Sequence, residues 1–241
     1  MSTDNQQHRA PHHGDFSLSK PAYRYAYLHG FASGARSYKG VELAATFRRY
    51  GAHLCCPDLN SPSFSKLTYT GSLAVMSELD KEDLGTKWRL IGSSMGGYLA
   101  ARWAQLNPDR VDRLLLLCPG FDLPARWPQM IGQDAIDAWQ RTGEHLFERS
   151  PGEHIPVWWQ FMEDALTHPK APNVTCPTRI IHGTQDATVP VESSRAYANA
   201  HPLVELIEVN SDHGLGSALP EITREALEFF KLKPVSTSSA R

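Results

Sequence analysis

Short apolar segments typical of strands alternate along this chain with longer segments of helical periodicity, and this alternation constrains the fold most. The expected strands are residues 24–28, 53–56, 88–91, 111–117, 178–181 and 204–209. The expected helices are residues 39–50, 70–84, 95–106, 191–200 and 221–231. Because strands that are joined by helical crossovers pair in parallel, the pattern predicts an α/β fold with a mostly parallel sheet and helices on both faces.

The two ends of the chain lack this periodicity. Residues 1–20 are polar and rich in His and Gln, and residues 234–241 are rich in Ser. Segments of this composition bury too little apolar surface to fold, so we expect two disordered tails. Residues 21–233 have the length of one α/β domain, and we expect a single domain there.

Composition and charge argue against several classes of protein. A formal net charge of −2 gives no reason to expect nucleic acid or an anionic membrane surface as a partner. No run approaches the ~20 apolar residues of a membrane span. The N-terminus lacks the basic and apolar regions of a secretory signal. The four cysteines match no metal or redox motif, so we expect reduced thiols in a cytoplasmic protein; the oligomeric state stays open.

Residues 121–172 interrupt the alternation. This segment lies between two expected strands, is too long for a simple crossover, and mixes prolines with aromatic residues that include Trp127, Trp139, Trp158 and Trp159. We expect an inserted helical cap over a pocket, because long insertions in compact α/β domains often serve as lids. Trp158 and Trp159 are then candidates for substrate binding. The alternative is an ordinary helix pair whose aromatic side chains only pack on the sheet.

The sequence Gly92-Ser93-Ser94-Met95-Gly96 is the strongest local signal for chemistry. It matches G-x-S-x-G and lies between an expected strand and an expected helix, which is the context of a nucleophile elbow. The turn holds the serine hydroxyl clear of the sheet, and the helix N-terminus supplies positive potential for a developing oxyanion. The motif predicts Ser94 as a nucleophile; the alternative is a glycine-rich turn without chemistry.

A serine nucleophile needs a base, and two loops downstream supply candidates. Asp186 follows the fifth expected strand, and His213 follows the sixth. Sites in such sheets assemble at the carboxyl ends of the strands. The order Ser94, Asp186, His213 predicts His213 as the base and Asp186 as the acid that orients it. Asp212 is the competing acid, but a residue next to His213 usually points away from its ring, so we expect Asp212 to brace the loop.

The loop after the first expected strand begins His29-Gly30-Phe31. Hydrolases with a nucleophile elbow place the second oxyanion donor at this position. We therefore expect the backbone N–H groups of Phe31 and Met95 to form an oxyanion hole. His29 and His182 each lie at a strand end, and we interpret both as structural.

With these motifs, the chain resembles the α/β-hydrolase superfamily over residues 23–231. Residues 29–34, 92–97 and 211–213 are similar to small bacterial esterases of the YqiA type and to the human α/β-hydrolase-domain acyl-thioesterases. The resemblance implies the α/β-hydrolase fold, hydrolysis of a small-molecule ester or thioester without a cofactor or metal, and a triad of Ser94, Asp186 and His213. The insertion at 121–172 is longer than the connections of the smallest esterases, which leaves the size of the substrate open.

Other functions remain open at this point. The same triad could perform C–C bond hydrolysis, lactone opening, amide cleavage or perhydrolysis, because a fold does not fix the chemistry. A non-catalytic binding module is the alternative from another class; loss of a triad residue would favour it, and none is lost. Nucleotide binding by the glycine-rich turn is excluded, because that turn contains neither G-x-G-x-x-G nor the P-loop lysine.

Overall fold

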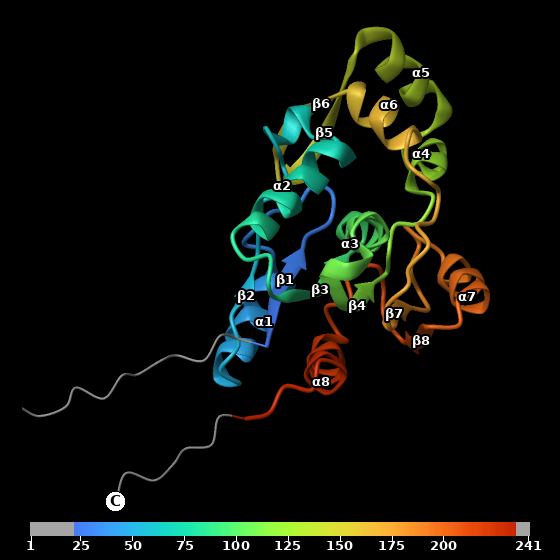
Figure 1. The fold of residues 1–241 in the computed structure, drawn as a ribbon. Coiled ribbons are helices and arrows are strands. Elements are labelled where there is room, and N and C mark those ends of the chain that lie inside the picture. Colours follow the sequence, from blue (N-terminus) through green and yellow to red (C-terminus); the bar gives the residue numbers. More distant parts are fainter. Residues whose placement is uncertain (1–21, 235–241) are drawn as a thin grey trace, which may run out of the picture.

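The computed structural model describes residues 22–234 and contains a six-stranded parallel sheet (Figure 1). The predicted tails at 1–20 and 234–241 lie outside the described residues, Pro234 excepted. The strands lie in the order β2 (Leu54–Cys55), β1 (Tyr23–Leu28), β3 (Lys87–Ser93), β4 (Val111–Leu117), β7 (Thr178–Gly183) and β8 (Val204–Val209). All neighbours in this sheet pair in parallel, which confirms the predicted sheet.

The central strand β4 shows why the sheet needs cover on both faces. Leu114 and Leu116 pack into the hydrophobic cluster on one face, and Leu115 and Leu117 pack into the cluster on the other. All four side chains are fully buried. This near-continuous apolar run is typical of a parallel strand that is covered on both sides.

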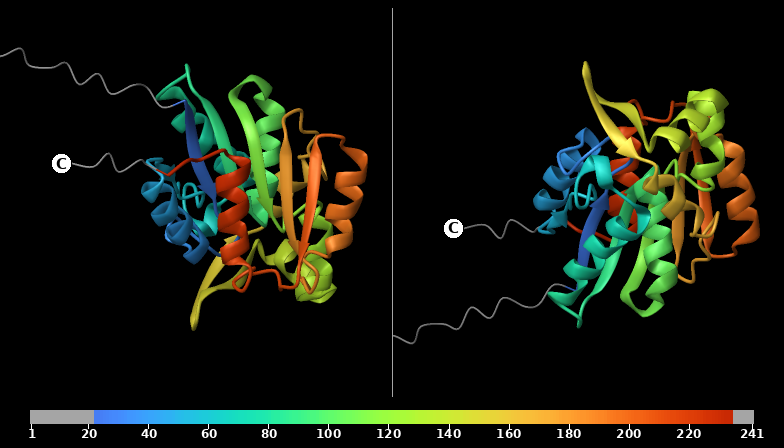
Figure 2. Two further views of the ribbon diagram at one scale, coloured as in Figure 1. Left: turned by 90° about the horizontal axis from the view of Figure 1, so that it is seen from below. Right: turned by 90° about the horizontal axis from the view of Figure 1, so that it is seen from above.

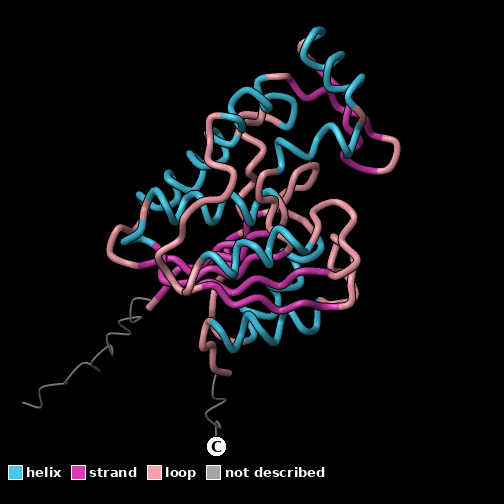
Figure 3. The backbone as a smooth tube through the Cα atoms, turned by 90° about the vertical axis from the view of Figure 1, so that its right-hand side faces the viewer, coloured by secondary structure: helices cyan, strands magenta, loops and turns pink. Residues whose placement is uncertain are grey.

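Helices cover both faces of the sheet, as Figures 2 and 3 show. The first face carries α1 (Tyr38–Arg49) and α8 (Leu219–Phe229), whose apolar residues join one cluster. The second face carries α2 (Tyr69–Lys81), α3 (Met95–Leu106) and α7 (Val191–Ala200), whose apolar residues join the other. The short 3-10 turns Phe64–Lys66 and Pro108–Arg110 complete the regular structure of this part.

The segment 121–172 lies beyond the carboxyl ends of the strands and mixes helices with a hairpin (Figure 1). Its elements are α4 (Leu123–Ile131), α5 (Gln133–Thr142), β5 (Glu144–Ser150), β6 (Glu153–Trp158) and α6 (Gln160–Leu166). The expectation of a purely helical insertion therefore missed the antiparallel pair β5–β6. Most β5 and β6 side chains are at least partly exposed, so no apolar alternation marks these strands. The turn at Pro151-Gly152 was the available signal.

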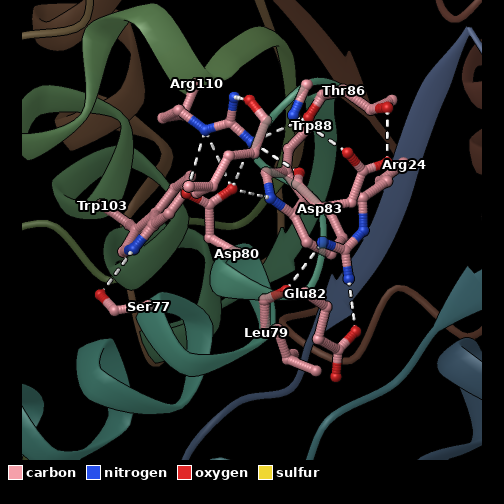
Figure 4. A network of polar contacts seen from close by, with 12 residues as sticks. Arg24, Ser77, Leu79, Asp80, Glu82, Asp83, Thr86, Trp88, Trp103 and Arg110 are labelled. Carbon is pink, nitrogen blue, oxygen red and sulfur yellow. Dashed lines mark hydrogen bonds and ion pairs between the residues drawn. The ribbon is translucent and has the colours of Figure 1, made fainter.

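A network of polar contacts fixes the amino ends of the strands (Figure 4). The Asp80 carboxylate of α2 accepts hydrogen bonds from Arg110 Nη2 over 2.7 Å and from Trp88 Nε1 over 2.8 Å. Arg24 of β1 donates to the Leu79 carbonyl oxygen over 2.7 Å. Because Trp88 belongs to β3, one carboxylate links α2 to the strand that leads to Ser94.

Two expectations from composition can be compared with the described residues. No helix within residues 22–234 combines the length and the apolar character that a membrane crossing requires. All four cysteines, which lie in this part of the chain, are free thiols: Cys55, Cys56, Cys118 and Cys176.

Candidate active site

Ser94 occupies a sharp turn between β3 and α3. Its φ of 54° and ψ of −121° are unusual for a residue with a side chain, and such strain is characteristic of functional turns. The turn requires close backbone approaches. A Cβ atom on Gly96 would lie 2.1 Å from the Leu28 carbonyl oxygen, and a Cβ atom on Gly92 would lie 2.3 Å from the Gly96 carbonyl oxygen. These glycines therefore let the helix pack against the strands directly beneath the serine.

The three residues predicted as a triad lie in one hydrogen-bonded row. His213 Nε2 lies 3.0 Å from Ser94 Oγ, and His213 Nδ1 lies 2.7 Å from Asp186 Oδ2. The Asp186 side chain is fully buried, whereas a quarter of the His213 side chain is exposed. The carboxyl ends of β3, β7 and β8 bring these residues together, although Ser94 and His213 are 119 positions apart.

Hydrogen bonds keep Asp186 ionised despite its burial. Its Oδ1 accepts the backbone N–H groups of Thr188 and Val189 over 2.9 Å and 2.7 Å. Burial alone raises the pKa of this carboxyl, but hydrogen bonds from His182, His213 and Val189 hold the pKa well below its usual range. Asp186 is thus an acceptor for His213 Nδ1–H.

His182 lies against this carboxylate, in agreement with its interpretation as structural. Its Nε2–H donates to the Val189 carbonyl oxygen over 2.8 Å and lies 3.2 Å from Asp186 Oδ2. Its Nδ1 lies 2.7 Å from Ser194 Oγ. Potential metal-ligand atoms of Cys118, His182 and Asp186 lie within 4.8 Å of one another. Because His182 Nε2 already donates a hydrogen bond, the group fits a support for Asp186 better than a cation site.

Phe31 and Met95, whose amides are the predicted oxyanion donors, lie close to Ser94 in the cavity and in the chain, respectively. Met95 is the first residue of α3, so its N–H has no partner within the helix. A Cβ atom on Gly30 would lie 3.3 Å from Ser94 Cβ, which places the Gly30–Phe31 peptide beside the nucleophile. His29 braces this loop: Leu59 N–H donates to its Nε2 over 2.9 Å, and its Nδ1–H donates to the Gly30 carbonyl oxygen over 2.9 Å.

The Phe31 side chain ties this loop to the insertion. Its ring centroid lies 5.1 Å from that of Trp127, 5.0 Å from that of Phe147 and 5.2 Å from that of Phe161. Trp127 and Trp139 are almost completely buried in the same cluster. These aromatic residues of the insertion are core residues that hold the loop carrying the Phe31 amide.

Trp158 and Trp159, the predicted substrate-binding residues, lie elsewhere. Trp158 is 38% exposed and its ring stacks under Lys66 Nζ at 4.4 Å, while Trp159 packs on Trp139. Neither lines the cavity of about 310 Å³ at Ser94. Contact of these tryptophans with substrate stays a prediction.

The cavity at Ser94 is lined instead by residues of the β1–α1 connection and of the first turn of α1. These residues are Ser33, Ser37, Tyr38 and Lys39. Sequence reasoning missed these residues because nothing in their spacing distinguishes them from an ordinary helix start. A larger cavity of about 660 Å³ lies beside Trp88 at the amino ends of the strands, away from the nucleophile.

Asp212, the competing acid, braces its own loop as expected. Its Oδ1 accepts the backbone N–H of Leu215 over 3.1 Å. The contact to His213 Nδ1 comes from Asp186.

Comparison with known proteins relates the chain to hydrolases. The chain is 24% identical over 153 residues to "Pimeloyl-[acyl-carrier protein] methyl ester esterase" of Chromobacterium violaceum, covering 50% of this chain and 60% of that protein. It is 29% identical over 139 residues to "Palmitoyl-protein thioesterase ABHD10, mitochondrial" of Rattus norvegicus, covering 52% of this chain and 44% of that protein. The chain thus spans about half the length of the curated relatives it matches.

Solved structures share the fold over most of the chain. "Alpha/beta hydrolase domain-containing protein 10 from mouse" superposes with a TM-score of 0.74 at 18% identity, covering 89% of this chain and 92% of that one. Est1E from Butyrivibrio proteoclasticus superposes with a TM-score of 0.67 at 21% identity, covering 88% of each chain. These similarities confirm the predicted α/β-hydrolase fold. The model of the family described as "Uncharacterised protein family (UPF0227)" matches residues 24–231, and the chain belongs to this family.

Proposed function

We propose that this protein hydrolyses carboxylic esters or thioesters through an acyl-enzyme on Ser94. The observation that carries the proposal is the hydrogen-bonded row from Asp186 through His213 to Ser94. The row ends beside the free N–H of Met95 at a helix N-terminus, where a developing negative charge is stabilised. The esterase and thioesterase names of the relatives agree with this chemistry.

In the first step, Ser94 Oγ attacks the substrate carbonyl carbon while His213 Nε2 accepts the hydroxyl proton. The carbonyl oxygen becomes an oxyanion, for which the amides of Phe31 and Met95 are the proposed donors. As the tetrahedral intermediate collapses, the bond to the alcohol or thiol breaks, and His213 returns its proton to that leaving group. Asp186 accepts the hydrogen bond from His213 Nδ1–H throughout and stabilises the imidazolium that forms.

In the second step, water attacks the acyl-enzyme. His213 Nε2 removes a proton from this water, the bond between the acyl carbon and Ser94 Oγ breaks, and the serine regains its proton. The carboxylic acid leaves, and the enzyme returns to its starting state. Every proton transfer uses the atom of His213 that already lies 3.0 Å from Ser94 Oγ.

A fluorophosphonate probe followed by peptide mass spectrometry tests the nucleophile. We expect the adduct on Ser94 and the loss of p-nitrophenyl butyrate hydrolysis in Ser94→Ala. The adjacent Ser93 is a matched control, because it lacks a histidine contact among the described residues, and Ser93→Ala should still be labelled on Ser94. Labelling at another residue, or undiminished turnover in Ser94→Ala, contradicts the proposal. Equally fast cleavage of p-nitrobutyranilide would favour the amidase alternative.

A further inference from the structure

A lysine side chain is bonded to the loop that carries His213. Lys39, in the first turn of α1, lines the cavity together with Ser94 and His213. Its Nζ donates a hydrogen bond to the Gly214 carbonyl oxygen over 2.6 Å. Gly214 directly follows His213, so the ammonium is anchored next to the group that would protonate the leaving group.

This ammonium lacks a carboxylate partner among residues 22–234, where no ion pair within 4.0 Å involves Lys39. Partial burial lowers the pKa of Lys39, an effect that Cys118 and Asp212 partly offset from a distance. A partly desolvated cation that has no carboxylate in direct contact is costly. An anionic group on a bound molecule would remove that cost.

The neighbouring surface carries charges of both signs. A hollow of about 460 Å³ adjoins the cavity through Ser33 and Ser37, and Arg36 and Arg149 both line it. Neither arginine forms an ion pair within the described part of the chain, but the carboxylates of Asp58 and Glu153 line the same hollow. The charged side chains of the hollow therefore balance, and the preference for an anion rests on Lys39 itself.

We propose that the leaving group of the substrate carries a carboxylate or phosphate, and that Lys39 binds this anion. The assignment to the leaving-group side follows from the mechanism. His213 Nε2 must lie next to the departing oxygen or sulfur to protonate it, and Lys39 is hydrogen-bonded to the adjoining residue. This inference rests on the proposed ester or thioester hydrolysis.

Four butyryl thioesters of short thiols, which end in a neutral, an anionic or a cationic group, test the inference. The thiols are 2-mercaptoethanol, 3-mercaptopropionate, 2-mercaptoethyl phosphate and thiocholine, and a thiol-reactive chromogen reports their release. We expect kcat/KM to be about tenfold higher for the anionic thioesters than for the neutral one. A factor of this size corresponds to the net free energy of one hydrogen bond to a charged group. The cationic thioester should be the poorest substrate. The ranking of carboxylate against phosphate identifies which anion fits Lys39.

Variants of Lys39 separate charge from loop structure. Lys39→Gln keeps a donor for the Gly214 carbonyl oxygen but loses the charge, so the ratio of anionic to neutral kcat/KM should fall towards one. Lys39→Arg should keep most of the preference. Lys81→Gln is the matched control, because it removes one exposed cation from α2, far from the cavity, and should leave the ratio unchanged.

Two results would overturn the inference. One is a wild-type enzyme that hydrolyses the neutral and anionic thioesters equally well, a result that needs no folded variant. The other is an anion preference that persists in a folded Lys39→Gln variant, as judged by circular dichroism. Failure of the proposed function is distinguishable from both, because it would appear as hydrolysis of the neutral thioester that survives in Ser94→Ala.

Discussion

Replacing Asp186 with Asn tests the proposed orientation of His213 with almost no change in volume. Asp186 Oδ1 accepts two backbone N–H groups, from Thr188 and Val189. In the variant, the amide oxygen must take this position, because an NH₂ group there would face two donors. The new NH₂ group then faces His213 Nδ1, which must present its lone pair, so the ring proton moves to Nε2 and points at Ser94.

In this tautomer His213 has no lone pair for the Ser94 proton. We expect kcat to fall by about 10³–10⁴-fold, which is the known consequence of the wrong tautomer in a serine triad. Steady-state hydrolysis of p-nitrophenyl butyrate measures the effect, and circular dichroism checks that the variant is folded. The matched control is Asp212→Asn, whose amide oxygen can still accept a hydrogen bond from the N–H of Leu215. The kcat of this variant should therefore fall by less than about tenfold. The reasoning is refuted if Asp212→Asn is the more damaging change, or if Asp186→Asn loses less than tenfold.

Two further predictions concern stability. Asp80→Asn leaves the Arg110 guanidinium without its carboxylate and weakens the bond from Trp88, so we expect a loss of about 3 kcal/mol. Calorimetry should show Tm lower by about 6–12 °C, and an unchanged Tm would contradict this role. Hydrogen bonds outweigh burial and depress the pKa of Asp186 in the folded protein. The ionised Asp186 therefore adds to the free energy of unfolding in full above the ordinary carboxyl pKa, and this contribution declines as the pH falls through the folded-state pKa. Urea titrations should give a larger difference in unfolding free energy between the wild type and Asp186→Asn at about pH 6 than at about pH 3. A larger difference at about pH 3 would contradict a lowered pKa of Asp186.

Local patterns sufficed for the strands, the helices and the elbow. The helices expected at 95–106 and 191–200 have these bounds, because a capping turn or a proline marks their ends in the sequence. The strand β4 is recognisable from its apolar run alone. The hairpin β5–β6 left no such pattern, since most of its side chains are not buried on either face. The hairpin packs on the rest of the fold through Phe147 and Val157, which are buried in the same cluster as Trp127 and Trp139.

The sequence by itself determined which residues could react: a serine in an elbow, and an acid and a histidine after successive strands. This works because parallel strands end at the same edge of the sheet, so the residues that follow their carboxyl ends lie along that edge. Only the tertiary structure decided what surrounds them. It buried Trp127 and Trp139 in a core that holds Phe31, left Trp158 on the surface, and brought Lys39 to Gly214, 175 positions along the chain. Contacts between such distant residues depend on how helices pack across the sheet, and no spacing along the chain encodes them.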